Sequence, residues 1–130
     1  MIPYGKQAID KYDIKSVAKC LKTDFLTQGP LVAKFEDILK KKFKSNSATC
    51  VINGSAALLL IGKILGWKNG DKIAVPPITF VSSVNSIEHL KAKPLFVDIS
   101  LDDYGMDPNL SEAELIKDKR KKIKAAIITD

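Results

Sequence analysis

Small residues stand where an apolar helix is expected to begin, in the segment VINGSAALLLIGKIL at residues 51–65. The first amide groups of a helix lack partners inside the helix, and the helix dipole makes this end positive. Gly54 would let a ligand approach the backbone closely, and Ser55 offers a cap and a hydroxyl group. The turn is therefore suited to a phosphate dianion. A tight turn with an ordinary cap explains the same residues, and neither a Walker loop nor a three-glycine dinucleotide pattern is present.

A second group of candidates follows the expected strand at 72–75. Phe80, in the segment PPITFVSS, could stack on a planar cofactor, with Thr79 or Ser82 as polar contacts. The alternative is that Phe80 belongs to the core. Asp98 ends the next apolar segment, PLFVD, where it could contact a ligand or cap the loop.

Other residue types that carry chemistry are sparse. His89 is the only histidine, and with Glu88 beside it near an expected helix end, a capping role on the surface is favoured over catalysis. Cys20 and Cys50 lack metal-type spacing and indicate reduced thiols of a cytosolic protein. We find no Ser/His/Asp set, metal cluster or catalytic pair of carboxylates.

The elements that would position these residues alternate in type along the chain. Two helices come first, one capped by Asp13 and one over 32–43. Three helices then lie between apolar strands: one buried on every side up to about Leu65, one up to about Leu90, and one capped by Ser111. The strands are expected at 48–52, 72–75, 94–99 and 124–129.

Strand–helix alternation predicts an α/β fold, with a parallel-rich sheet covered by helices on both faces. Right-handed crossovers place every strand-to-helix loop at one edge of such a sheet. Ligands of open α/β sheets bind at this carboxyl edge. The turn at Gly54 and the loop at Phe80 are therefore expected to lie near each other.

Composition is ordinary for a soluble domain: the 130 residues are 45% hydrophobic and 28% charged. No apolar run approaches the roughly 20 residues that span a bilayer, and the N-terminus lacks a signal-peptide pattern. The net charge of +6 comes largely from lysines at 40–44 and 117–124, and Arg120 is the only arginine. Since both clusters fall near expected helix ends, where lysines complement the dipole, a nucleic-acid-binding module is disfavoured; salt-sensitive affinity would be its mark.

Five motifs occur in one collinear series: IPYGKQAI, DIKSVAKCLKTDFLTQGPLVAKFE, VINGSAALLL, GDKIAVPPITFVSSVNSI and KPLFVDIS. In this order the chain resembles the N-terminal third of the DegT/DnrJ/StrS family of sugar-nucleotide aminotransferases. The resemblance implies pyridoxal 5'-phosphate (PLP) as cofactor and the large domain of fold type I. LTQGP together with PITFVSS is most similar to members that aminate UDP-linked keto sugars for nonulosonic acids.

The resemblance also assigns roles to residues. It implies that the amides of Ser55 and Ala56, after Gly54, hold the cofactor phosphate, and that Phe80 lies against the pyridine ring. Carried over in the same way, Tyr4, Leu26 and Thr27 contact the sugar nucleotide. These three come from the resemblance alone.

For the whole enzyme, the resemblance implies amino transfer, usually from glutamate, in a cytoplasmic homodimer. Residues 1–30 would form an arm, a helix and a substrate loop, and residues 31–130 part of the PLP-binding large domain. Three features of family members lie downstream of the region that these 130 residues resemble. They are the catalytic lysine, the aspartate that pairs with the pyridine nitrogen, and the C-terminal domain.

We therefore expect a truncated fragment that is inactive by itself. Asp130 directly follows an expected strand, and a half-built sheet would aggregate or depend on a partner. The alternative is a naturally short, non-catalytic homologue that binds or regulates a full-length relative.

Overall fold

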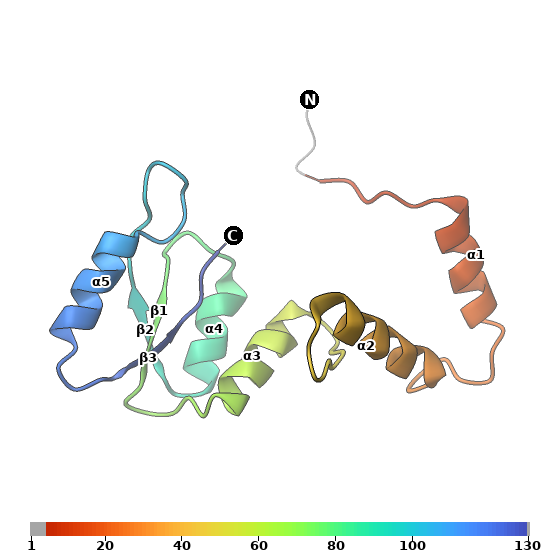
Figure 1. The fold of residues 1–130 in the computed structure, drawn as a ribbon, viewed down its shortest axis with the longest axis horizontal. Helices are drawn as coiled ribbons and strands as arrows, with labels where there is room; N and C mark the ends of the chain where they lie inside the picture. Colours follow the sequence, from red (N-terminus) through yellow and green to blue (C-terminus); the bar gives the residue numbers. More distant parts are fainter. Residues whose placement is uncertain (1–4, 130) are drawn as a thin grey trace. The chain divides into compact units, whose positions relative to one another are not determined.

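The computed structural model describes residues 5–129 and divides into two compact units (Figure 1). The first unit contains residues up to Cys50, and the second begins at Val51. In the described part of the chain, the first unit contains two helices, and the second contains the sheet and three helices. Among the helices of residues 5–129, none is long and apolar enough to cross a membrane.

The first unit begins with helix α1, Lys11–Cys20, which starts in a reciprocal capping box. The Asp10 carboxylate accepts from the Tyr12 and Asp13 amides at 2.7 and 3.0 Å, and the Asp13 carboxylate accepts from the Asp10 amide at 2.9 Å. The prediction of Asp13 as the cap was wrong. Both aspartates can accept from backbone amides, but Asp10 has the extended backbone that an N-cap needs.

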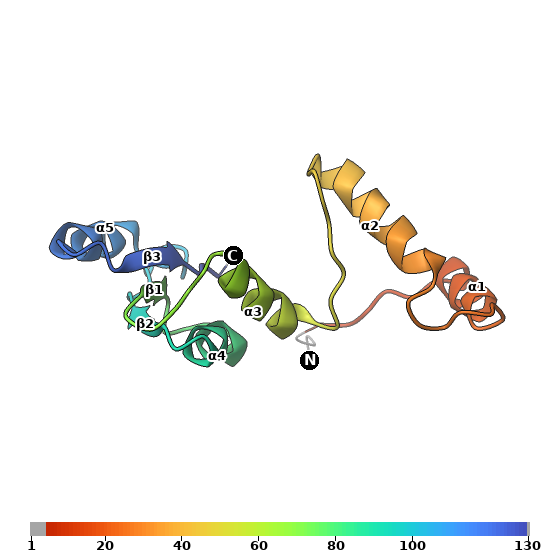
Figure 2. The same ribbon diagram turned by 90° about the horizontal axis from the view of Figure 1, so that it is seen from below.

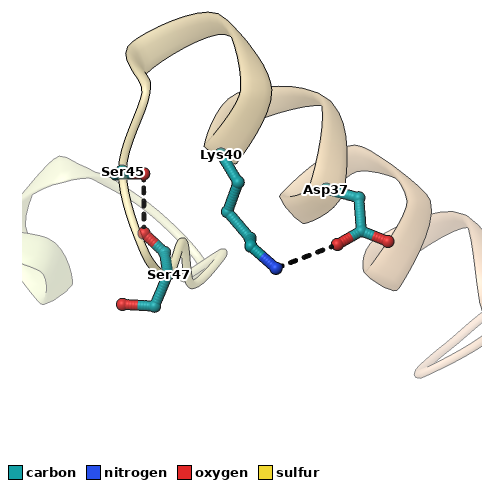
Figure 3. A network of polar contacts seen from close by, with 4 residues as sticks. All are labelled: Asp37, Lys40, Ser45 and Ser47. Carbon is teal, nitrogen blue, oxygen red and sulfur yellow. Dashed lines mark hydrogen bonds and ion pairs between the residues drawn. The ribbon is translucent and has the colours of Figure 1, made fainter.

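Helix α2 spans Pro30–Phe43, two residues earlier than expected. Proline fits the first turn of a helix, because its missing N–H would have no partner there. The lysine cluster does fall at the helix end: three lysines occupy the last turn, and Lys44 ends the helix in a left-handed conformation. Figure 3 shows this end, where Lys40 Nζ lies 3.4 Å from Asp37 Oδ1 and the Ser45 hydroxyl donates to the Ser47 carbonyl.

Neither helix of the first unit buries a residue. The apolar side chains of α2, such as Phe35 and Ile38, are about half exposed. Helices in proteins gain most of their stability from packing of an apolar face. The first unit therefore presents apolar surface that none of its described residues, 5–50, covers.

The second unit contains a parallel sheet of three strands in the order β2-β1-β3. The strands are β1, Lys72–Val75, β2, Lys93–Phe96, and β3, Ile123–Ala126. The predicted strand at 48–52 is absent, and Ile52 is 90% exposed. Sequence pattern alone does not make a strand, because an extended segment needs a neighbour for its hydrogen bonds, and none of the described strands pairs with this one.

Helix α4, Val81–His89, covers one face of the sheet (Figure 2). Ile73 and Val75 of β1 pack with Ile87 of α4 and with Trp67, and these side chains form the core of the second unit. Since successive strand residues point to opposite faces, Ala74 faces the other way. There it borders a cavity of about 240 Å³ beside helix α5.

Helix α5 spans Pro108–Lys117 and begins three residues before the predicted cap. The Asp107 carboxylate accepts from the Asn109 and Leu110 amides at 2.7 and 3.0 Å, whereas the Ser111 hydroxyl donates to the Asp107 carbonyl. Ser111 as the cap was therefore wrong, since Asp107 followed by a proline is the stronger start signal. The expected α/β class, with helices on both faces of a parallel sheet, is confirmed.

Helix α3, Gly54–Ile64, is not buried on every side. Only Gly62 is buried, and Ile64 is 75% exposed. An alanine methyl at Gly62 would lie 2.5 Å from Leu90 and 2.6 Å from Trp67, so the glycine permits close packing of α3 in this region. The opposite side of α3 stays apolar and uncovered within the second unit.

Candidate functional site

The turn before α3 presents two backbone amides. Asn53 is extended and caps the helix, with its side-chain oxygen accepting from the Ala56 amide at 2.9 Å. The Ala57 amide bonds to the Asn53 carbonyl. Within residues 5–129 the amides of Gly54 and Ser55 have no acceptor. Asn53, rather than Ser55, is thus the cap, which leaves the Ser55 hydroxyl for other contacts.

Nothing in the part of the chain that the structure describes requires a glycine at position 54. Its φ is not positive, and a methyl group added there would meet no atom within 4 Å. Glycine is useful where another molecule must approach the backbone closely. The space beside Gly54 is therefore consistent with a ligand at the start of α3.

Phe80 is not a core residue. Its side chain is 73% exposed, and it stands at the N-cap position of α4 without a capping hydrogen bond. An aromatic ring exposed to this degree gains little from the fold itself. Its place at the carboxyl end of β1 instead makes it available to a ligand.

A broad hollow of about 780 Å³ joins these features. Its lining residues come from the starts of α3 and α4 and from the segment after β3, at the carboxyl edge expected to bind ligands in a parallel sheet. Figure 1 shows the carboxyl ends of β1 and β3 on the same side of the sheet as the start of α4. The residues of interest come from three segments far apart in sequence. They are Gly54, Ser55, Thr79, Phe80, Ser83 and Thr129.

Three hydroxyl groups connect two of these segments. The Thr129 hydroxyl donates to Thr79 Oγ1 at 3.0 Å, and Thr79 Oγ1 lies 3.2 Å from Ser83 Oγ. Our reading of the sequence picked out Thr79 but missed Ser83 and Thr129. Local pattern gives no signal for a contact across 50 residues, so only the parallel pairing of β1 and β3 could have indicated Thr129.

The other predicted site residues lie apart from the hollow. Ala56 lines an adjoining groove of about 240 Å³ that reaches His89, at the exposed end of α4. The Asp98 carboxylate accepts from the Ile99 amide at 2.8 Å, as a loop cap would. Leu26 and Thr27 lie exposed in the loop after α1, in the first unit. Tyr4 lies outside the described residues.

The chemistry of the hollow fits PLP. The cofactor carries a phosphate dianion and a planar ring, and the hollow offers free amides with a hydroxyl group at a helix N-terminus and an exposed aromatic side chain. Among the described residues that line it there is no lysine. Residues 5–129 also contain no group of three potential metal ligands.

Comparison with known proteins decides the family. Residues 7–129 match the model of the DegT/DnrJ/EryC1/StrS aminotransferase family. The chain belongs to this family. The family assignment made from the sequence motifs is confirmed.

Curated relatives act on different nucleotide sugars by name. The chain is 35% identical over 122 residues to the UDP-4-amino-4-deoxy-L-arabinose–oxoglutarate aminotransferase of Shewanella sediminis, covering 94% of this chain and 31% of the relative. It is 31% identical over 128 residues to the GDP-perosamine synthase of Vibrio cholerae, covering 98% and 34%. The chain thus spans about a third of the length of these relatives.

Solved structures agree on the fold. Spr1654 of Streptococcus pneumoniae, assigned as a sugar aminotransferase and solved in its PLP form, matches with a TM-score of 0.79 and 32% identity over 86% of this chain and 29% of its own. A DegT/DnrJ/EryC1/StrS aminotransferase from Brucella abortus matches with a TM-score of 0.78 and 29% identity, over 88% and 32%. The chain therefore has part of the fold of PLP-dependent aminotransferases.

Proposed function

We propose that this chain supplies the N-terminal part of the active site of a PLP-dependent aminotransferase acting on a nucleotide-linked keto sugar. One observation carries the proposal: the fold brings the free amides at Gly54 and Ser55 to the same hollow as the exposed ring of Phe80. Family membership and the names of the relatives support the reaction class. Glutamate is the proposed amino donor.

In this proposal each residue binds or orients the cofactor. The Gly54 and Ser55 amides and the Ser55 hydroxyl hold the phosphate, with the helix dipole adding to the attraction. Ala56 completes the same turn, although its amide is engaged by Asn53 in this structure. Phe80 packs on one face of the pyridine ring and excludes water from it. When bound, PLP supplies the electron sink and the carrier for the amino group.

The proposed substrate contacts lie in the first unit and at the N-terminus. Tyr4, Leu26 and Thr27 would touch the sugar nucleotide, and a UDP-linked keto sugar used for nonulosonic acids is the proposed subclass. In the same proposal, residues 1–30 form a substrate segment and residues 31–130 form part of the cofactor domain. The whole enzyme is proposed to be a cytoplasmic homodimer.

The proposal separates binding from turnover. Since no lysine lines the hollow among the described residues, the 130 residues alone should bind the cofactor without transferring an amino group. Titration with pyridoxamine 5'-phosphate, which needs no lysine, tests binding: Ser55→Ala and Phe80→Ala should each weaken it, and Thr49→Val, at an exposed position elsewhere, should not. Equal affinity for all four proteins would refute the assigned site.

A second candidate is a non-catalytic binding partner of a full-length relative. The exposed apolar surface of α1, α2 and α3 favours it, since large uncovered patches mark association surfaces. Co-expression with a full-length relative decides between the two. A stable mixed complex without pyridoxamine 5'-phosphate binding by this chain would favour the partner role.

A further inference from the structure

The start of α4 is held in an unusual way. Phe80 occupies the N-cap position, but its side chain cannot accept a hydrogen bond from the free amides of the first turn. The Ser83 amide does bond to the Phe80 carbonyl at 3.0 Å. Ordering of this first turn therefore depends on contacts outside the usual cap.

Hydroxyl groups supply those contacts. Thr79 precedes Phe80 and Ser83 follows it by one helical turn, and their hydroxyl oxygens lie 3.2 Å apart. The Thr129 hydroxyl donates to Thr79 at 3.0 Å, and either hydroxyl can be the donor in the contact between Thr79 and Ser83. Ser83 is 7% exposed, so its hydroxyl gains from a protein partner. Along the chain, Phe80 thus lies between two residues whose hydroxyl groups contact each other, and one of these residues also bonds to Thr129, just after β3.

We propose that Thr79 is a positioning residue for Phe80. Through Thr129 and Ser83 it fixes the backbone from which the ring projects, and so fixes the ring's place in the hollow. The exposed ring has little packing of its own to hold it, because its side chain is 73% exposed. The inference rests on the proposed function, since the ring matters only if a planar ligand stacks on it.

A double-mutant cycle in the full chain tests whether Thr79 acts through Phe80. The probe is pyridoxamine 5'-phosphate, titrated into the original protein, Thr79→Val, Phe80→Ala and the double variant. Thr79→Val removes the hydroxyl contacts to both Thr129 and Ser83. Less exact placement of the ring is expected to weaken binding about fivefold, a free-energy loss similar to the net contribution of one hydrogen bond. In the Phe80→Ala background the same change should have almost no effect, because the ring that Thr79 orients is gone.

Matched variants separate positioning from loss of folding. Thr79→Ser keeps the hydroxyl and should retain the original affinity, and Thr129→Val should weaken binding like Thr79→Val. Thr49→Val is the control for a threonine change at an exposed position. Amide exchange at Ser83 should rise in Thr79→Val and return to normal in Thr79→Ser.

The outcomes are distinct. The positioning role is refuted if Thr79→Val weakens binding equally in the original protein and in Phe80→Ala. It is also refuted if Thr79→Val leaves binding unchanged in both. A failure of Thr79→Ser to restore affinity would also refute it. If the original chain does not bind pyridoxamine 5'-phosphate at all, the proposed function fails instead, and with it the premise of the inference.

Discussion

Replacing each of two glycines of α3 by alanine should have opposite consequences. At Gly62 the new methyl group would lie 2.5 Å from Leu90 Cδ1 and 2.6 Å from Trp67 Cε3, closer than carbon atoms pack. The leucine can rotate, but the largely buried indole is held by the core. At Gly54 the methyl group would meet nothing within 4 Å.

The magnitudes follow from packing and helix propensity. Overpacking a core costs about 1–3 kcal/mol, and alanine regains roughly 1 kcal/mol over glycine in a helix interior. Gly62→Ala should therefore lower the free energy of unfolding by about 1 kcal/mol, which lowers Tm by about 4–8 °C in a unit of this size. Gly54→Ala should change stability by less than about 0.5 kcal/mol.

The assay is thermal unfolding followed by the fluorescence of Trp67, the only tryptophan, together with titration of pyridoxamine 5'-phosphate. Gly54→Ala should lose about tenfold or more in affinity, because the methyl group keeps the phosphate from amides whose charged hydrogen bonds contribute about 1.5–3 kcal/mol. Gly62→Ala should bind normally once folded. Equal or higher stability of Gly62→Ala would refute the packing argument, and unchanged affinity of Gly54→Ala would refute the phosphate site.

Three further predictions concern the same unit. Phe80→Ala should leave Tm almost unchanged but weaken pyridoxamine 5'-phosphate binding several-fold, since stacking contributes about 0.5–1.5 kcal/mol; a large fall in Tm would show that the ring is structural. Asp107→Ala should lower stability by about 1 kcal/mol in thermal unfolding, whereas Asp107→Asn, which keeps the cap, should not; equal losses would contradict the capping role. Affinity for pyridoxamine 5'-phosphate should fall below about pH 6, because protonation of the phosphate weakens its attraction to the amides of the α3 turn; an affinity independent of pH in titration calorimetry would argue against a bound dianion.

Local signals in the sequence predicted much of the second unit. Apolar strands bounded by turn residues placed β1, β2 and β3 to within a few residues, and small residues before an apolar run placed the start of α3. Cap positions were less predictable. Asp10 and Asp13 are both good acceptors, and only the backbone conformation of the folded chain shows which one stands at the cap.

The errors share a physical cause, which is that neighbours decide what a segment becomes. Residues 48–52 read as a strand, but a strand needs a partner for its backbone groups, and no described strand pairs with them. The apolar composition of helix α3 predicted burial on every side, yet one side of the helix is exposed. Apolar residues favour burial, but composition does not show which other element will cover them.

The sequence by itself determined the family and the α/β class, because the ordered motifs and the strand–helix alternation can be read along the chain. It left open whether Phe80 belongs to the core, and only the structure shows that its ring is exposed. Tertiary structure decided which of the candidate residues line the same hollow. Parallel pairing of β3 with β1 brings Thr129 to Thr79 across 50 residues, and so brings Thr129 to the hollow that Phe80 also lines. Contacts of this kind depend on which strands pair, and no local pattern encodes that choice.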